Sequence, residues 1–95
     1  MLTHDEARDL FATKVDEYET LTGIEVVILD EVTIEREWGW VFRYQSKKYA
    51  ETGNMNDMLF GSSGTFVNRY DGSMHETGSA HSLDHYIEEY ENRLR

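Results

Sequence analysis

Three histidines near the end of the chain, His75, His81 and His85, are close enough in sequence to suggest a metal site. His81 and His85 are four residues apart, a spacing that on a helix would place both rings on one side. However, Ser82 is a typical helix N-cap, so we expect His81 to lie outside the helix. The intervening residues, Ser-Leu-Asp, also lack the glutamate that follows the first histidine of a zinc protease. We therefore expect surface or hydrogen-bonded histidines and no metal site.

Nucleophilic catalysis would need a reactive side chain beside a base. The chain has no cysteine, and the Gly-Ser-Ser-Gly stretch at residues 61–64 lacks the strand and helix that flank a hydrolase serine. The glycine spacing matches neither a dinucleotide fingerprint nor a phosphate loop. Glu88 and Glu89 are adjacent, so on a helix their carboxylates would point apart. We expect a protein that is not an enzyme and holds no cofactor.

The composition describes one acidic domain, residues 1–95. Nineteen acidic against nine basic residues give a net charge of −10. Such a charge argues against nucleic acid or an anionic membrane as partner and favours encounter with a basic protein. No apolar run is long enough to cross a bilayer, and the N-terminus lacks the features of a signal peptide. We expect a cytoplasmic protein.

Two helices are predicted, one at each end of the chain. Thr3–Leu21 carries apolar residues at helical spacing, with a Thr3–Glu6 capping box at its start and Gly23 as a stop. The last helix follows Ser82, and its apolar stripe is Leu83, Tyr86, Ile87, Tyr90 and Leu94.

Between the helices, the patterns predict strands at Ile24–Leu29, Thr33–Tyr44, Thr65–Tyr70 and Ser73–Thr77, with a two-residue hairpin turn at Asp71-Gly72. The order α-β-β-β-β-α indicates a small α+β domain with a four-stranded antiparallel sheet and both helices packed on one face. The hairpin would leave a strand edge open, so both a monomer and a homodimer are compatible with the sequence.

Aromatic residues occupy every second position of the second strand: Trp38, Trp40, Phe42 and Tyr44. Alternate side chains of a strand lie on one face, so these four should form either much of the core or an exposed docking surface. Val41 and Arg43 would then point to solvent or to an uncovered face of the sheet.

The irregular segment Gln45–Gly64 is the candidate binding region, because a connection of this length inside a compact domain is often functional. Asp57–Phe60 has the character of one short helical turn. Gln45 and Ser46 could bond the backbone of the turn, with Tyr49 packed beneath the loop. Alternatively, the segment and the corner before the last helix form a rim that meets a protein partner. The candidate residues are Arg43, Gln45, Ser46, Lys47, Lys48, Tyr49, Asn54, Asp57, Ser79 and His81.

Residues 41–61, VFRYQSKKYAETGNMNDMLFG, and 65–91, TFVNRYDGSMHETGSAHSLDHYIEEYE, together resemble the immunity protein 35 family, also described as the YrhB-like domain. The first helix fits in general character only. The resemblance implies a protein made beside a bacterial toxin that neutralises it, with no catalytic residues to carry over. Members of the group are also described as small chaperone-like proteins.

Two functions therefore remain open. The first is a stoichiometric inhibitor that occludes the active cleft of a cognate toxin with a basic surface; the acidic face of the first helix, Asp9, Asp16 and Glu19, is an alternative docking surface for it. The second is a chaperone-like holdase that binds unfolded chains through an exposed aromatic sheet face. An inhibitor needs one partner and a specific patch, whereas a holdase needs contiguous apolar surface and little selectivity.

Overall fold

The first helix, α1 (His4–Thr22), begins and ends as its caps predict. Thr3 accepts a hydrogen bond from the Glu6 N–H, and the Glu6 carboxylate accepts one from the Thr3 N–H, which completes the capping box. At the other end Gly23 adopts the left-handed conformation and its N–H bonds to the Glu19 carbonyl. The predicted boundaries of this helix are confirmed within one residue.

The computed structural model describes residues 1–59 and 64–95, and within them it shows an α+β fold. The other helices are α2 (Lys47–Thr52) and α3 (Leu83–Arg93), with 3₁₀ turns η1 (Asp30–Val32) and η2 (Met55–Asp57). The strands are β1 (Val26–Ile28), β2 (Ile34–Arg36), β3 (Gly39–Phe42), β4 (Tyr44–Ser46), β5 (Thr65–Asn68) and β6 (Met74–Glu76). No helix in these two ranges has the length and apolar character needed to cross a membrane.

The predicted long strand Thr33–Tyr44 is wrong, because it contains a hairpin turn. β2 pairs antiparallel with β3, and Arg36 lies opposite Gly39, so Glu37 and Trp38 form the turn. Gly39 has φ +152°, and a Cβ there would lie 2.0 Å from the Val67 carbonyl oxygen. Only glycine fits this close approach of two backbones.

The chain continues from β3 through Arg43 into β4, which pairs with β1. Between the pairs Ile28–Tyr44 and Ile34–Val41, five residues (29–33) lie opposite two (42–43). The three extra residues equal the length of η1, so this 3₁₀ turn is an insertion that separates two sections of one long hairpin.

The larger sheet is antiparallel, with four strands in the order β2-β3-β5-β6, as the predicted fold class requires. The first predicted strand is not part of this sheet, because β1 pairs with β4 in a separate two-stranded sheet. The hairpin between β5 and β6 is also confirmed, but its loop is longer than predicted. The Gly72 N–H bonds to the Asn68 carbonyl and the Asn68 N–H bonds to the Ser73 carbonyl, which leaves residues 69–72 as the loop. β6 is an edge of the sheet, as the homodimer hypothesis requires, and the oligomeric state stays a prediction.

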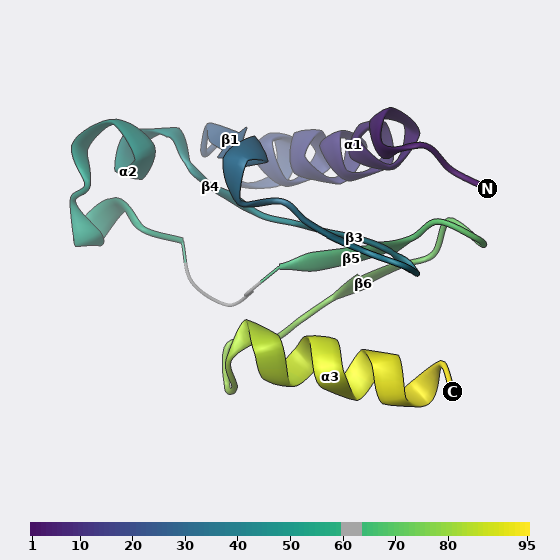
Figure 1. Ribbon diagram of the computed structural model, residues 1–95. Helices are drawn as coiled ribbons and strands as arrows, with labels where there is room; N and C mark the ends of the chain where they lie inside the picture. The colour runs from purple at the N-terminus through teal and green to yellow at the C-terminus, as the bar shows by residue number, and fades with distance from the viewer. Residues whose placement is uncertain (60–63) are drawn as a thin grey trace.

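The two long helices cover opposite faces of the sheet, so the prediction that both pack on one face is wrong. Figure 1 shows α1 above the sheet and α3 below it. Val41, which we expected at an open face, is fully buried on the α3 side. The α1 layer buries Ala7, Phe11, Val15, Trp40, Phe42 and Val67; the α3 layer buries Trp38, Val41, Phe66, Ile87 and Tyr90.

The alternating aromatic residues, Trp38, Trp40, Phe42 and Tyr44, belong to the core of the protein. Trp40 and Phe42 are buried beneath α1, and Tyr44 packs against that cluster, where burial raises the pKa of its phenol. Trp38 lies in the turn and joins the opposite cluster. The aromatic residues are therefore core, and the exposed aromatic sheet face that we expected for a holdase is absent from the described residues.

Candidate functional site

After β4, residues 47–59 fold into a compact segment, which we call the wall. Its structure was not predicted in detail from the sequence. We expected an irregular connection from Gln45, yet residues 47–52 form α2 and Met55–Asp57 form η2. The predicted turn Asp57–Phe60 ends at Phe60, which lies outside the described residues, as do Gly61, Ser62 and Ser63.

Two polar residues at the end of β4 hold this wall in place. The buried Gln45 amide binds the Leu59 backbone on both sides: its nitrogen donates to the carbonyl at 3.3 Å, and its oxygen accepts from the N–H at 2.6 Å. Ser46 caps α2 by accepting from the Tyr49 N–H at 3.0 Å, and its hydroxyl donates to the Asp57 carbonyl at 2.5 Å. Thus the local role that we considered for Gln45 and Ser46 is present in the structure.

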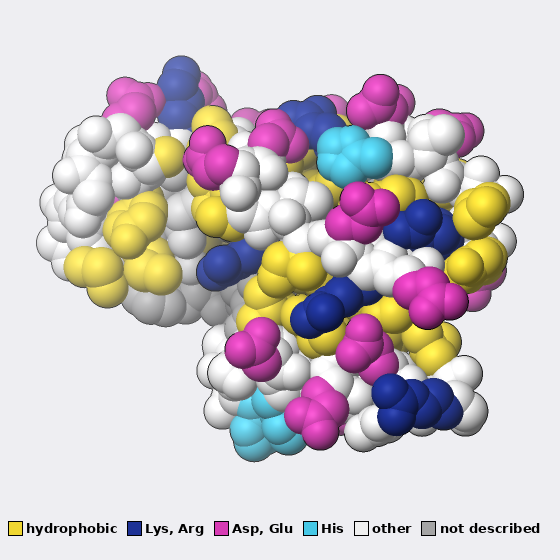
Figure 2. All heavy atoms as spheres, in the orientation of Figure 1, with side chains coloured by type: hydrophobic (Ala, Val, Ile, Leu, Met, Phe, Trp, Pro, Cys, Tyr) yellow, Lys and Arg dark blue, Asp and Glu magenta, His cyan; other side chains and the backbone are white. Residues whose placement is uncertain are grey.

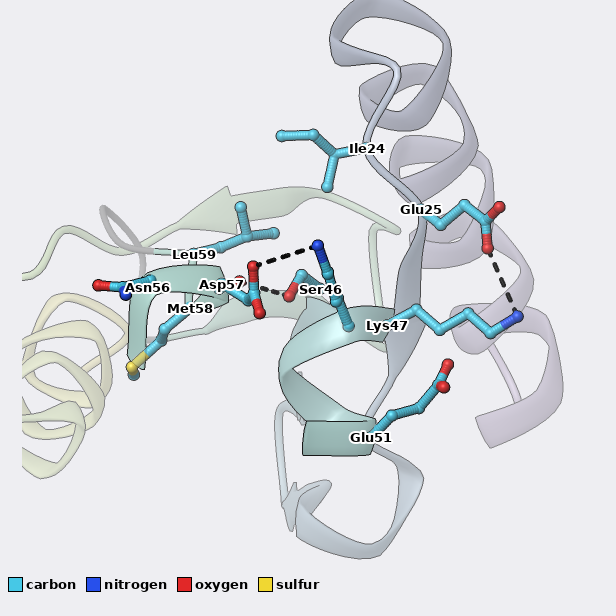
Figure 3. A pocket seen from close by; sticks show the side chains of 10 residues that line it. Ile24, Glu25, Ser46, Lys47, Glu51, Asn56, Asp57, Met58 and Leu59 are labelled. Atoms are coloured by element: carbon cyan, nitrogen blue, oxygen red, sulfur yellow. Dashed lines mark hydrogen bonds and ion pairs between the residues drawn. The ribbon is translucent and has the colours of Figure 1, made fainter. Parts of the chain in front are cut away.

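A groove of about 540 Å³ lies between this wall and the residues that join α1 to β1; we call it the α2 groove. Its lining includes Ile24 and Glu25 before β1, Ser46, Lys47, Lys48 and Glu51 around α2, and Asn56, Asp57, Met58 and Leu59 at η2 and beyond. Figure 3 shows Lys47 extending from α2 towards Glu25, and Asp57 lying beside Ser46. In Figure 2, hydrophobic side chains gather at the same end of the molecule, at left.

Both lysines of the groove are held by carboxylates. Lys47 Nζ lies 3.5 Å from Glu25 Oε2, and Lys48 Nζ lies 4.0 Å from Asp57 Oδ1 (Figure 3). Asp57 is the more enclosed partner, with 23% of its side chain exposed, whereas that of Lys48 is 77% exposed. The groove thus presents two lysines, each beside a carboxylate, together with apolar side chains, an arrangement suited to recognition of another protein surface.

The remaining predicted residues are divided between this region and other parts of the surface. Arg43 is exposed between β3 and β4, Tyr49 is half-buried in α2, and Asn54 caps η2 by accepting from the Asn56 N–H at 3.0 Å. Ser79 and His81 are exposed but do not line the groove.

Six residues that line the groove were not predicted from the sequence: Ile24, Glu25, Glu51, Asn56, Met58 and Leu59. The apolar pair 58–59 inside a polar segment was the available signal. Glu25 could not be found from local patterns, since it reaches Lys47 only through the pairing of β1 with β4: the Lys47 N–H bonds to the Glu25 carbonyl at 2.9 Å.

The histidines near the C-terminus were the candidate metal ligands. In residues 1–59 and 64–95 no group of three or more His, Cys, Asp or Glu side chains could hold a metal ion. Ser82 does cap α3, and the rings of His81 and His85 lie with centroids 4.2 Å apart at its start.

The acidic face of α1 is the alternative docking surface. Asp9 and Asp16 are exposed, and among the described residues their carboxylates form no ion pair within 4.0 Å. Glu19 differs from them, because its carboxylate accepts from the Val26 N–H at 3.1 Å and so joins α1 to β1.

The chain is similar in sequence to known proteins. The model of the family described as Immunity protein 35 matches residues 5–93. The chain is also similar to the uncharacterized protein YrhB of Escherichia coli (strain K12), with 30% identity over 53 residues. That match covers 56% of each chain, so it spans about half the length of this curated relative. No solved structure is significantly similar to the chain.

Proposed function

Because the chain belongs to the immunity protein 35 family, whose model matches residues 5–93, we propose that it neutralises a cognate bacterial protein toxin by binding it. The family match carries this proposal. The protein acts as a stoichiometric inhibitor, in the cytoplasm of the producing cell, and occludes the active cleft of the toxin without chemistry of its own.

We propose the α2 groove as the docking surface. It offers a cavity of about 540 Å³ in which the apolar side chains of Ile24, Met58 and Leu59 lie beside two lysines, a mixture that protein interfaces use for both burial and specificity. Lys47, Lys48 and Asp57 are the contact residues. Gln45 and Ser46 have buried side chains, so they support the groove and do not meet the partner directly.

The acidic face of α1 would serve the encounter with the toxin. Asp9 and Asp16 are exposed carboxylates on a chain of net charge −10, and they would attract a toxin with a basic surface. In the complex, Asp9 and Asp16 would occupy the position at which the toxin binds a phosphate group.

Co-expression with the product of the neighbouring gene, followed by pull-down of the tagged protein, tests the proposal. We expect a 1:1 complex and restored growth of cells that make the toxin. The double variant Lys47→Gln with Lys48→Gln should weaken the complex about tenfold or more, since it removes two contact cations together with their ion pairs to Glu25 and Asp57. Lys14→Gln is the control for the loss of one such cation, because Lys14 is likewise an exposed lysine beside a carboxylate, 3.8 Å from Glu17.

The outcomes separate the alternatives. Binding and protection that survive in the groove variant but fail in variants of α1 would move the interface to the acidic face. A pair that neither binds nor protects, together with suppressed aggregation of unrelated heat-denatured proteins, would favour the chaperone-like function. In that case the holdase surface must be other than the aromatic face, which the helices cover.

A further inference from the structure

A second hollow lies at the opposite end of the molecule from α2, where two hairpin ends and the last turn of α3 meet (Figure 1). We call it the hairpin slot, and its volume is about 450 Å³. Glu37 and Trp38 come from the β2–β3 turn, Asn68 and Tyr70 from the end of β5 and its loop, and Glu91, Leu94 and Arg95 from α3 and beyond.

A hydrogen bond between two of these segments orients one carboxylate in the slot. The indole Nε1 of Trp38 donates to Glu91 Oε2 at 3.0 Å. Trp38 is only 6% exposed and packs edge-on against Tyr90, with ring centroids 4.7 Å apart, so the indole is held firmly. Glu91 is therefore a partly buried carboxylate whose direction is set by the core.

Exposed aromatic and apolar surface stands beside this carboxylate. Tyr70 is 62% exposed and Leu94 is 50% exposed, although both line a concave site. Glu37 adds a second carboxylate from the β2–β3 turn, against the single cation of Arg95. The slot thus combines an accessible aromatic ring, an apolar wall and an excess of negative charge.

From this combination we infer that the hairpin slot binds one cationic side chain of a protein partner, preferably arginine. A guanidinium can stack on the Tyr70 ring while it donates hydrogen bonds to the carboxylates of Glu37 and Glu91. A lysine ammonium fits the same charges but loses the planar stacking. The net charge of −10 further favours a cationic ligand over an anionic one.

The inference goes beyond the proposed function, because the slot lies outside the α2 groove and its test needs no toxin. If the arginine probe does not bind in the hairpin slot, the proposal for the α2 groove is unaffected. If no toxin binds, the proposal for the hairpin slot is unaffected. If both hold, the slot offers a basic toxin a second anchoring point.

The two tryptophans provide the readout and its internal control. In a ¹H–¹⁵N spectrum of the full chain, the indole N–H of Trp38 reports on the slot, whereas Trp40 is 2% exposed and packed beneath α1. Titration with N-acetyl-arginine amide should shift the Trp38 signal saturably and leave the Trp40 signal in place. The citrulline analogue, a neutral isostere, should produce a much smaller shift.

Charge variants complete the test. Glu91→Gln keeps an oxygen that can accept from the Trp38 indole but removes the charge, and it should weaken binding of the arginine probe about threefold or more. Glu37→Gln should act in the same direction. Glu88→Gln, the same change at an exposed position of α3 outside the slot, should leave the affinity unchanged. Equal shifts by both probes, no saturable shift, or unchanged affinity in Glu91→Gln would overturn the inference.

Discussion

Gln45 and Leu59 are fourteen positions apart in sequence, yet the Gln45 amide binds both the N–H and the carbonyl of Leu59. The Gln45 side chain thereby makes the two hydrogen bonds to the Leu59 backbone that a neighbouring strand would otherwise make. Because Gln45 is the central residue of β4 and lies opposite Val27 of β1, this clamp ties the outer wall of the α2 groove to the two-stranded sheet.

Removal of the clamp should cost stability. We expect Gln45→Ala to lower the free energy of unfolding by about 1–3 kcal/mol, since backbone groups of Leu59 and Ser46 lose their partner. Urea denaturation measures this difference. Asn54→Ala removes one exposed cap bond in the same segment and should cost about 1 kcal/mol or less. Equal losses in both variants would contradict a special role for the clamp.

The close approach at Gly39 makes a sharper prediction. Gly39→Ala should lower the free energy of unfolding by about 3 kcal/mol or more, because the new methyl group would meet the Val67 carbonyl oxygen at 2.0 Å. Gly23 is the control: it has φ +72° but nothing within 4 Å of an added Cβ, so Gly23→Ala should cost only about 1 kcal/mol. Thermal or urea unfolding of the two variants distinguishes crowding from backbone strain.

Charge reversal on α1 tests the proposed electrostatic encounter. Asp9→Lys with Asp16→Lys should slow association with a basic toxin about tenfold at low salt and flatten the salt dependence of the association rate, which stopped-flow mixing measures. Glu19 is left intact, because its carboxylate also binds the Val26 N–H. The same charge change at Glu76 and Glu88 is the control, and equal slowing there would show that only net charge matters.

A pH dependence is expected from the pair Arg8–Asp30. Two hydrogen bonds from the guanidinium, at 2.7 and 2.9 Å, lower the pKa of the Asp30 carboxyl. Because the pKa of Asp30 is lower in the folded protein than in the unfolded chain, where it is roughly 4, the pair stabilises the fold at pH values above the unfolded-state pKa. This contribution disappears as the pH falls through the folded-state pKa. The side chains are 36% and 55% exposed, so the contribution should be about 0.5 kcal/mol or less.

Urea denaturation of the wild type and of Asp30→Asn measures this contribution. The difference in unfolding free energy should be present near neutral pH and absent in acid. Asp16→Asn makes the same change at an exposed position of α1 that has no ion pair within 4.0 Å among the described residues, and it serves as the control for the loss of one carboxylate. A difference for Asp30→Asn that persists in acid would contradict the linkage.

Much of the secondary structure was predictable because its signals are local. The Thr3–Glu6 box and Ser82 act within one turn of their helices, and both caps are formed as expected. The turn at Glu37-Trp38 was missed since it has no Asn-Gly or Asp-Gly pair, and the glycine that makes it possible follows the turn. The signal for the doubly covered sheet was the apolar run Trp40-Val41-Phe42, which has no polar position to face water.

By itself, the sequence determined the acidic composition, the ends of the first helix, the antiparallel strands and the resemblance to a family, because composition, capping and strand alternation depend on residues close in the chain. Only the tertiary structure decided that α1 and α3 lie on opposite faces, that Gln45 supports the groove from inside, and that Lys47 meets Glu25. Those relationships join residues far apart in sequence. They depend on which apolar surfaces pack against each other in the folded protein, and local sequence patterns do not contain that information.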